Sequence, residues 1–402
     1  MPPKTQQLHA AVQSGQPEML QRLRTLVAIE SPSDDSAAVN LAADQVHQWA
    51  EAAGAHVLRH PQECFGDVTE IWFEPAAPQP AGTRPLLLLG HLDTVWSIGT
   101  LAQMPWREEP DRDGKPRLWG PGVLDMKAGV LMALSAIAAV RQCGDLPRPV
   151  VLLLNPDEEV GSHVSREHTE RLAALAEAVF VLEPAQGMPG TPANGAYKTA
   201  RKGIGNYRIE VTGVAAHAGV DFTNGRSAVL ELARLLAQIA ALSEAGKDFG
   251  ITVNPGVIGG GTRSNVVPAN AWAEIDVRVP TQADAARVHE ALTALTTTDP
   301  GCTVNITGGL NRPPMERTEG TIALYERART LAQELGFTLN EAATGGGSDG
   351  NFTATLGTPT LDGMGPVGEG AHAAHESLLT DHLLPRTALL AAMIAAITAE
   401  SR

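Results

Sequence analysis

The stretch RPVVLLLNPDEE (residues 148–159) decides the predicted fold, because a strongly apolar run ends abruptly in two adjacent glutamates. A short apolar run bounded by turn-forming residues predicts a strand that is buried on both faces. Two neighbouring carboxylates repel one another, and a buried carboxylate is costly unless it is paired or bound to a metal. Adjacent side chains on an extended backbone point in different directions, so one glutamate can bind a cation while the other faces a reacting water. Glu158 and Glu159 therefore indicate a site at this strand end.

Two more apolar runs end in polar residues in the same way, at 84–93 (RPLLLLGHLD) and 176–184 (AEAVFVLEP). Between the first run and 148–159, a Gly-rich turn leads into an apolar helix at 125–143. Strands that alternate with helices predict an α/β domain, a mixed sheet flanked by helices on both faces. Ligands of such sheets bind beyond the carboxyl ends of the strands. His91, Asp93, Glu158, Glu159 and Glu183 all fall there.

The middle of the chain has a different pattern, which predicts a second domain inserted into the first. Its predicted strands and helices follow the order β-α-β-β-α-β, the α+β ferredoxin-like plan. The strands are 205–213, 251–260, 271–280 and 303–307, and the helices are 226–242 and 282–297. Helices are also predicted at 16–29, 36–53, 318–336 and 380–399. We therefore predict a first domain at 1–201 and 312–402, with the insertion at 202–311.

Composition excludes several classes of function. The formal charge of −15 argues against nucleic-acid binding, since phosphates attract the opposite sign. No apolar run approaches eighteen residues, which predicts no membrane span. Cys64, Cys143 and Cys302 are odd in number and far apart, as expected in a reducing cytoplasm rather than in a disulfide framework.

Several residues suit metal chemistry together, although each alone has an ordinary explanation. Asp125 on its Gly-rich turn fits a helix N-cap, and His217 and His372, both between small residues, fit buried core histidines. His91 and Asp93, two apart on a strand end, share a face, and a carboxylate there can hold the second ring nitrogen of a histidine ligand. Two more histidines and several carboxylates on loops suit a divalent metal, with Zn²⁺ favoured and Mn²⁺ or Co²⁺ as alternatives.

The ordered motifs resemble the di-zinc aminoacylase/carboxypeptidase metallopeptidase family, and most of all its bacterial glutamate carboxypeptidases. The matching stretches run from 90 to 376 and so cover nearly the whole chain. They are GHLDTVW, GPGVLDMKAG, NPDEEVGS, LEP, AAHAG, SNVVP, IDVR, TGGGSDGNF and GEGAHAAHE.

The resemblance implies two Zn²⁺ ions per subunit, bridged by Asp125. His91 and Glu183 would complete one site, and Glu159 and His372 the other; His375 is the alternative to His372, which fits the motif spacing better. The resemblance also implies Asp93 as the partner of His91, Glu158 as general base, and a cis peptide after Asp125.

For the inserted domain, the resemblance implies a role in dimerisation, so that the protein is expected to be a homodimer. His217 would then reach the active site of the partner subunit and stabilise an oxyanion. Arg278 and Asn265 would bind the substrate carboxylate, with a surface salt bridge as the alternative for Arg278. Arg312, Gly346 and Gly347 are further pocket candidates. We interpret Lys198, Arg201 and Lys202 as a solvated hinge rather than a pocket for an acidic side chain.

We therefore predict a cytoplasmic metallopeptidase that releases a C-terminal amino acid from a small peptide or N-acyl amino acid. The alternatives are an N-acyl-amino-acid deacylase or dipeptidase of the same family, and, in another class, a catalytically inert metal-binding homologue. The intact set of ligands, together with Glu158, argues against the inert homologue.

Overall fold

The computed structural model describes residues 4–187 and 195–398, and the chain divides into two compact units. The first comprises Met1–Ala200, Arg317–Thr344 and Ser348–Arg402; the second comprises Arg201–Glu316 and Gly345–Gly347. The second unit thus extends slightly beyond the 202–311 that we predicted. It includes Arg312, Gly346 and Gly347, which the prediction had left in the first domain.

The first unit is built on a six-stranded mixed sheet in the order β1-β2-β6-β3-β7-β16. Strands β6, β3, β7 and β16 run parallel to one another, and β2 and β1 continue the sheet antiparallel at one edge. The predicted mixed sheet is confirmed. The strands are β1 (His56–His60), β2 (Val68–Phe73), β3 (Leu86–His91), β6 (Val150–Asn155), β7 (Ala178–Val181) and β16 (Thr360–Leu361).

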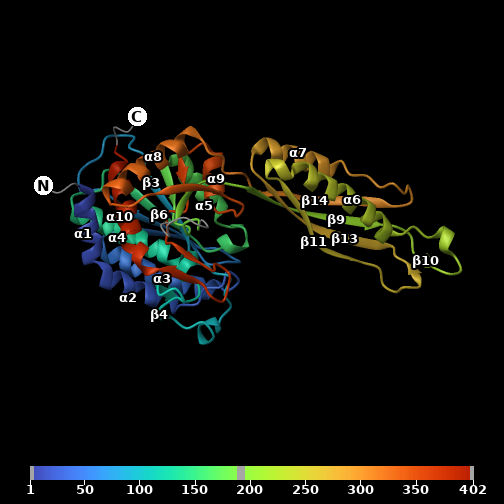
Figure 1. Cartoon of the computed structure of the whole chain (residues 1–402), viewed down its shortest axis with the longest axis horizontal. Coiled ribbons are helices and arrows are strands. Elements are labelled where there is room, and N and C mark those ends of the chain that lie inside the picture. The colour runs from blue at the N-terminus through green and yellow to red at the C-terminus, as the bar shows by residue number, and fades with distance from the viewer. Residues whose placement is uncertain (1–3, 188–194, 399–402) are drawn as a thin grey trace. The chain divides into compact units, whose positions relative to one another are not determined.

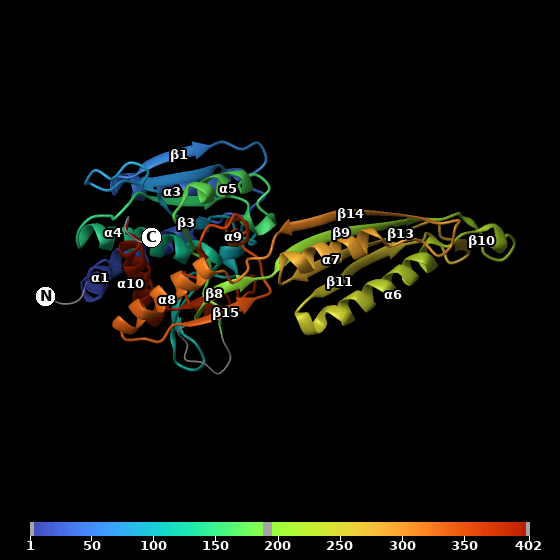
Figure 2. The same cartoon turned by 90° about the horizontal axis from the view of Figure 1, so that it is seen from above.

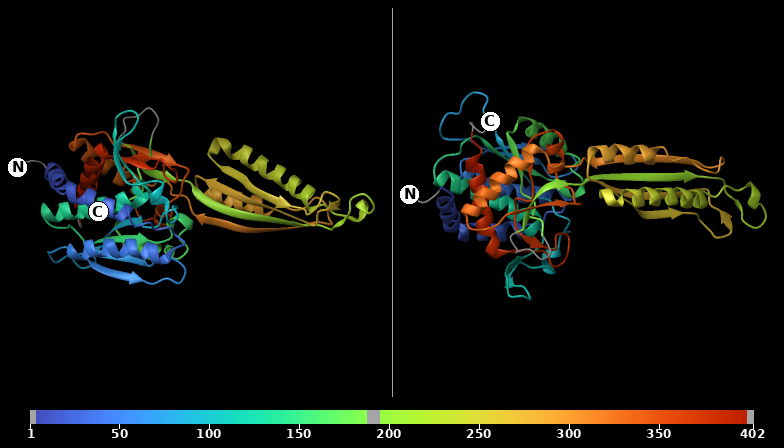
Figure 3. Two further views of the ribbon diagram at one scale, coloured as in Figure 1. Left: turned by 90° about the horizontal axis from the view of Figure 1, so that it is seen from below. Right: turned by 45° about the horizontal axis from the view of Figure 1, so that its top comes forward.

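The central strands β3 and β6 are apolar up to their last residues, His91 and Asn155, because both of their faces are covered (Figures 1 and 3). Leu86 and Leu88 of β3 pack into one hydrophobic cluster, while Leu87 and Leu89 pack into another on the opposite face. Burying each such leucine contributes about 1.5–3 kcal/mol. Burial on both faces thus explains why β3 and β6 lack the alternation of apolar and polar residues that a half-exposed strand shows.

Most helices of this unit contribute to the larger cluster, and α5 packs on the other face. The two predicted N-terminal helices are present as α2 and α3, and the sequence analysis missed the α1 that precedes them. The helices are α1 (Lys4–Ser14), α2 (Gln16–Val27), α3 (Ser36–Ala52), α4 (Ala128–Gln142), α5 (Arg166–Leu175), α8 (Glu319–Glu334), α9 (Gly350–Thr355) and α10 (Thr380–Ala396).

The segment Val123–Gln142, which contains α4, is long and apolar enough to cross a membrane by length and composition. Most of it is buried inside the first unit, where α4 packs against α10, α1 and α2. Its apolar character is therefore accounted for by its place in the core.

The second unit has the predicted ferredoxin-like plan. Its four antiparallel strands lie in the order β11-β13-β9-β14, and α6 and α7 cover one face (Figures 1 and 2). The last strand is longer than the predicted 303–307. The elements are β9 (Gly203–Thr212), α6 (Ala228–Gly246), β11 (Thr252–Gly260), β13 (Asn270–Val279), α7 (Gln282–Thr293) and β14 (Thr303–Arg312).

Short strands and single-turn helices complete the two units. In the first unit β17 (Gly368–Glu369), β18 (Ser377–Leu379), β5 (Pro116–Trp119) and β4 (Arg107–Pro110) form a small sheet, and β15 (Asn340–Thr344) pairs with β8 (Ala196–Arg201). In the second, β10 (Ala216–His217) pairs with β12 (Val266–Val267). The single-turn helices are Thr100–Ala102, Glu158–Val160, Phe222–Asn224 and Lys247–Phe249.

Candidate metal centre

Three neighbouring parallel strands bring polar residues to one edge of the mixed sheet. His91 is the last residue of β3, Glu183 lies two residues beyond β7, and the Glu158–Glu159 pair follows β6. The pair lies on a single 3₁₀ turn, Glu158–Val160, and not on the extended backbone that we predicted. Successive residues of a 3₁₀ helix are about 120° apart, so the two side chains still diverge.

Asp125 reaches the same edge from the irregular turn Val123–Lys127, which precedes α4. Its peptide bond to Met126 is cis, as expected from the family resemblance. One carboxylate oxygen, Oδ1, lies 3.3 Å from His91 Nε2, and the other, Oδ2, lies 3.5 Å from His372 Nε2. Asp125 thus stands between two histidines, with one oxygen toward each.

Each histidine also contacts a second carboxylate, so two groups share Asp125. His91 Nε2 lies 3.6 Å from Glu183 Oε1, and His372 Nε2 lies 3.0 Å from Glu159 Oε2. His372 is therefore the histidine of GEGAHAAHE that lies against the cluster. It adopts a left-handed backbone conformation with φ of 61°, which is uncommon outside glycine and is found at functional sites.

The donor set fits divalent metal ions. In the described part of the chain, ligand atoms of His91, Asp125 and Glu159 lie within 4.8 Å of one another, as do those of His91, Glu158 and Glu183. His91 Nε2, Asp125 Oδ1 and Glu159 Oε1 are buried and make no hydrogen bond among the described residues. Imidazole and carboxylate ligands around such orphaned atoms suit zinc and its neighbours.

Electrostatics show how strongly this cluster attracts positive charge. Burial raises the pKa of Glu159 to about 7. Interactions with Asp125 and then Glu159 raise the pKa of His372 to about 10. Burial disfavours a charged His91, but Asp125, Asp93 and Glu183 outweigh it and raise the His91 pKa well above its usual value. The cluster therefore favours cationic partners for its carboxylates.

Asp93 organises both the histidine and the glutamate turn. Its Oδ1 lies 3.3 Å from His91 Nδ1 and accepts the backbone N–H of Glu158 at 3.2 Å. Its Oδ2 accepts the N–H of Glu159 at 3.1 Å and the Ser33 hydroxyl at 2.7 Å. Asp93 thus orients the His91 ring through its main-chain carbonyl, 3.0 Å from Nδ1, as well as through its fully buried carboxylate, and the carboxylate also fixes the start of the Glu158–Val160 turn.

Glu376 does the same for the Asp125 turn, a role that sequence reasoning missed. Its Oε1 accepts the backbone N–H groups of Leu124 and Asp125 at 2.9 and 3.1 Å. Its Oε2 accepts the N–H of Gly122 at 2.9 Å and the Trp96 indole N–H at 2.7 Å. Bonds to backbone N–H groups leave no sequence pattern; the one signal was the position of Glu376 in the GEGAHAAHE motif.

A third buried carboxylate, Asp349, supports the end of β6. It accepts the Asn155 amide at 2.6 Å through Oδ2 and the Ser162 hydroxyl through Oδ1. Ser162 has φ of 58° and closes the loop after Glu158–Val160. Asp93 and Glu376 therefore hold the backbone of the candidate ligands directly, while Asp349 fixes the side chains of Asn155 and Ser162 on either side of the glutamate turn.

Comparison with known proteins places this arrangement in a family. A family model described as peptidase family M20/M25/M40 matches residues 87–396, well over half of the chain. The chain belongs to this family. The family prediction is thereby confirmed, including the metallopeptidase class.

Curated relatives of this chain include a carboxypeptidase and a desuccinylase. The chain is 28% identical to carboxypeptidase G2 of Pseudomonas sp. (strain RS-16) over 395 residues. The match covers 96% of this chain and 91% of that protein. The chain is also 29% identical over 330 residues to succinyl-diaminopimelate desuccinylase of Stenotrophomonas maltophilia (strain K279a), covering 79% and 84%. A dinuclear metal-binding M20 peptidase from Bacillus subtilis shares the fold, with a TM-score of 0.64, 14% identity, and coverage of 95% and 98%.

The predicted residues of the second unit of this M20 peptidase fall into two groups at opposite ends of β13. His217 pairs with Val266 on the short β10–β12 ladder, beside Asn265. Arg278 is near the far end of β13, and a rise of about 3.4 Å per residue puts it roughly 27 Å from Asn270 at the near end. Within one chain, Arg278 and Asn265 therefore lie too far apart to bind the same carboxylate.

Arg278 is engaged in the salt bridge that we had named as its alternative. Its Nε lies 2.9 Å from Asp276 Oδ1, and its Nη1 donates to the Gly345 carbonyl at 3.4 Å. The guanidinium stays partly exposed. Its Nη2 also donates to Asp276 Oδ2 at 3.0 Å, so Asp276 and the Gly345 carbonyl together anchor the guanidinium.

The basic residues near this loop are not a solvated hinge, so that interpretation is wrong for two of them. Lys198 and Arg201 are 7% and 3% exposed. Arg201 Nη1 donates to the carbonyls of Gly346 and Gly347, at 3.1 and 2.9 Å. Arg312 is also buried, and its side chain and that of Ile204 together leave no room for a Cβ at Gly347. Arg201 and Arg312 therefore shape the loop from inside the unit.

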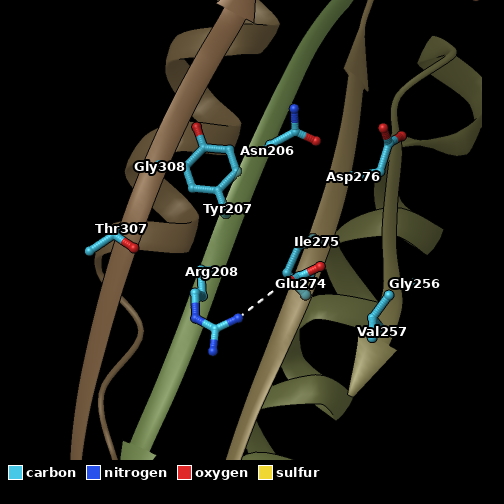
Figure 4. Close-up of a pocket in the computed structure, with 10 residues that line it drawn as sticks. All are labelled: Asn206, Tyr207, Arg208, Gly256, Val257, Glu274, Ile275, Asp276, Thr307 and Gly308. Carbon is cyan, nitrogen blue, oxygen red and sulfur yellow. Dashed lines mark hydrogen bonds and ion pairs between the residues drawn. The ribbon is translucent and has the colours of Figure 1, made fainter. Parts of the chain in front are cut away.

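A hollow of about 430 Å³ lies on the sheet face that α6 and α7 leave open, and it is not the metal centre (Figure 4). The ion pair between Arg208 and Glu274, 2.9 Å apart, crosses it from β9 to β13. None of the candidate metal ligands found in the described residues lines this hollow.

Glu376→Gln should destabilise the protein and lower turnover, because the amide would turn N–H donors toward backbone N–H groups that need an acceptor. We expect a loss of about 2–3 kcal/mol in the free energy of unfolding, measured by urea denaturation. Trp96→Phe is the matched control: it removes a single bond to Glu376 and should lose about 1 kcal/mol. Equal effects of the two variants would contradict the role of Glu376 as the anchor of the Asp125 turn.

Proposed function

We propose that the chain is a di-zinc hydrolase that cleaves an amide bond to release a C-terminal amino acid from a small peptide or N-acyl amino acid. The observation that carries the proposal is the pair of histidine–carboxylate groups that share Asp125. Similarity to carboxypeptidase G2 over nearly the whole chain supports the substrate class. A hydrolysis screen of N-acyl amino acids and dipeptides, with Zn²⁺, Mn²⁺ or Co²⁺ supplied, tests it.

Asp125 would bridge the two ions. His91 and Glu183 would complete one site, and Glu159 and His372 the other, in accordance with the 3.0–3.6 Å approaches within each group. Zn²⁺ is the ion that this ligand set favours, with Mn²⁺ and Co²⁺ as alternatives. The site is open on one side, because about half of the His372 side chain is exposed.

A dinuclear centre of this kind supplies Lewis acidity, which polarises a carbonyl and lowers the pKa of water. Glu158 would accept a proton from the attacking water on its carboxylate and pass it to the nitrogen of the leaving amine. Asp93 holds the N–H of Glu158 and so fixes the origin of that side chain. His217 would donate a hydrogen bond to the oxyanion that develops on the substrate carbonyl.

Glu158→Gln and Glu159→Gln should separate proton transfer from metal binding. Glu158→Gln removes the base, so turnover should fall about 10²–10⁴-fold while both metal ions remain. Glu159→Gln weakens a ligand, so one ion should be lost. Metal content by atomic emission and kcat on a hydrolysed substrate measure both effects.

His372→Ala should lose the same ion as Glu159→Gln, and His375→Ala is the matched control that should retain both. Glu158 itself also lies within ligand distance of His91 and Glu183. If the Glu158→Gln variant lost an ion, the roles of the two glutamates would be reversed.

Substrate recognition would rest on Arg278, whose guanidinium has the geometry to grip a carboxylate. Arg278→Ala should raise KM about 10–100-fold for substrates with a free α-carboxylate and leave amidated analogues unaffected. Arg208→Ala, which removes another paired arginine from the same sheet, is the control and should change neither KM. An equal effect of Arg278→Ala on amidated analogues would remove this role. Arg312, Gly346 and Gly347 would shape the pocket around Arg278.

We also propose a homodimer formed through the second unit. β11 is the outer strand of its sheet, and Val257 and Ile258 on it are 50% and 62% exposed. Leu230 on α6 is also exposed. Strand edges with exposed apolar residues are typically covered by another chain. In such a dimer, His217 and Asn265 would serve the active site of the partner.

Mixing two inactive variants tests whether His217 acts across the dimer. In a heterodimer of Glu158→Ala and His217→Ala subunits, one of the two sites has both an intact Glu158 and an intact partner His217. Random assortment makes half of the dimers mixed, so about a quarter of wild-type activity should return. Mixing Glu158→Ala with Glu159→Ala is the control and should restore none. No recovery in the first mixture, with dimers shown by light scattering, would place His217 in its own subunit's site or outside catalysis.

The second candidate is an N-acyl-amino-acid deacylase, favoured by the similarity to a desuccinylase. The same hydrolysis screen separates the two candidates. A carboxypeptidase should be selective for the released amino acid and tolerate different acyl groups, whereas a deacylase should be selective for the acyl group. A cytoplasmic location is proposed from the free thiols of Cys64, Cys143 and Cys302, which form no disulfide in the described structure.

A further inference from the structure

A second histidine–carboxylate cluster lies in the first unit on the antiparallel edge of its sheet, where residues of β1, β2 and α5 meet; β1 and α5 are labelled in Figure 2. His60 ends β1 and pairs with Val68, so it is the diagonal neighbour of Glu70 on one face of the hairpin. His168 comes from the first turn of α5. Ligand atoms of His60, Glu70 and His168 lie within 4.8 Å of one another, and the cluster shares no residue with the Asp125 centre.

One atom of this cluster is unexplained by protein contacts. His168 Nδ1 is buried and has no hydrogen-bond partner among the described residues. Its ring centroid lies 4.4 Å from that of His60, with the planes tilted by 44°. Burial, together with nearby His60 and Arg171, lowers the pKa of His168, so its imidazole is neutral and can offer a lone pair near neutral pH.

The carboxylate is held in place for a ligand. Glu70 is 2% exposed, and its Oε2 accepts the Trp72 indole N–H at 3.0 Å. Its Oε1 faces His60 Nε2 at 2.7 Å. A hydrogen bond to one oxygen of a carboxylate fixes the direction of the other, as outer partners do in metal sites.

We propose that His60, Glu70 and His168 form a third metal site, which binds one first-row divalent ion with Zn²⁺ preferred over Mg²⁺ or Mn²⁺. Two imidazoles and one carboxylate are a three-residue zinc ligand set that leaves a fourth position for water. The ion would join the β1–β2 hairpin to α5. Binding of this ion would not depend on the functions proposed for the Asp125 centre, since the two sites share no residue.

Arg171 would be the competitor of this ion. Its Nη2 contacts Glu70 Oε1, the oxygen that faces His60, and its side chain is 45% exposed. A guanidinium and a dication cannot both occupy that oxygen at close range, since like charges repel strongly where water is excluded. The arginine can move into solvent, so Glu70 has one of two cationic partners at a time.

The test is zinc stoichiometry after equilibrium dialysis of the full-length protein, with zinc measured by atomic emission. Wild type should bind three ions per chain and His168→Ala two, with hydrolytic activity unchanged because His168 lies outside the Asp125 centre. His163→Ala, which removes an exposed histidine from the same region, is the matched control and should keep three.

Arg171→Gln separates a metal site from a simple buried ion pair. It should tighten binding of the third ion about tenfold or more, because the competing cation is gone. If Arg171 is merely the structural partner of Glu70, the variant would be less stable and bind no more tightly. The proposal is overturned if wild type and His168→Ala bind equal numbers of ions, or if Arg171→Gln fails to tighten zinc binding.

Discussion

Carboxylates gathered at the ends of three adjacent strands must be compensated by cations, and the organisation of the first unit follows from this constraint. Asp125, Glu158, Glu159 and Glu183 converge with His91 and His372 where β3, β6 and β7 end. Removing such charges from water is costly unless they are paired. The same need for positive charge raises the pKa of His372 to about 10, because Asp125 and Glu159 stabilise its protonated ring. Two divalent ions would meet it with more charge in less volume than two protonated imidazoles.

The charged rim is held in position mainly by hydrogen bonds to backbone N–H groups. Asp93 fixes the Glu158–Val160 turn, and Glu376 fixes the turn that carries Asp125. Ionised acceptors of backbone N–H groups form stronger bonds than neutral ones. This arrangement assigns different tasks to chemically identical side chains. Asp93 and Glu376 accept backbone N–H groups through both oxygens, while Glu159 keeps a buried oxygen, Oε1, without a hydrogen-bond partner among the described residues.

The sequence predicted the mixed sheet and the ferredoxin-like insertion, and it placed His91, Glu158, Glu159 and Glu183 at strand ends, because each depends on local patterns. The assignment of Asp125 and His372 as ligands came only from the family resemblance. Apolar runs with abrupt polar ends identify buried strands, and ligands follow at their carboxyl ends. It missed α1, whose four buried residues include Thr5 and Ala11, whereas the four of α2 are all large and apolar. It also took Lys198 and Arg201 for solvated residues. Hydrophobicity patterns treat every lysine and arginine as exposed, whereas Arg201 is buried by bonding to the carbonyls of a loop more than a hundred residues away. The separation of Asn265 from Arg278 depends on strand length in space, which motif order does not encode.

That separation constrains how the second unit can contribute to catalysis. His217 and Asn265 lie at one end of β13 and Arg278 at the other, roughly 27 Å along the strand. A dipeptide or N-acyl amino acid spans about 10 Å at most, since an extended chain advances about 3.5 Å per residue. One substrate therefore cannot touch both ends of the same unit. If both ends act on one substrate, they must come from two copies of the chain. The rigid sheet between them then works as a spacer, whose length keeps a subunit from completing its own site.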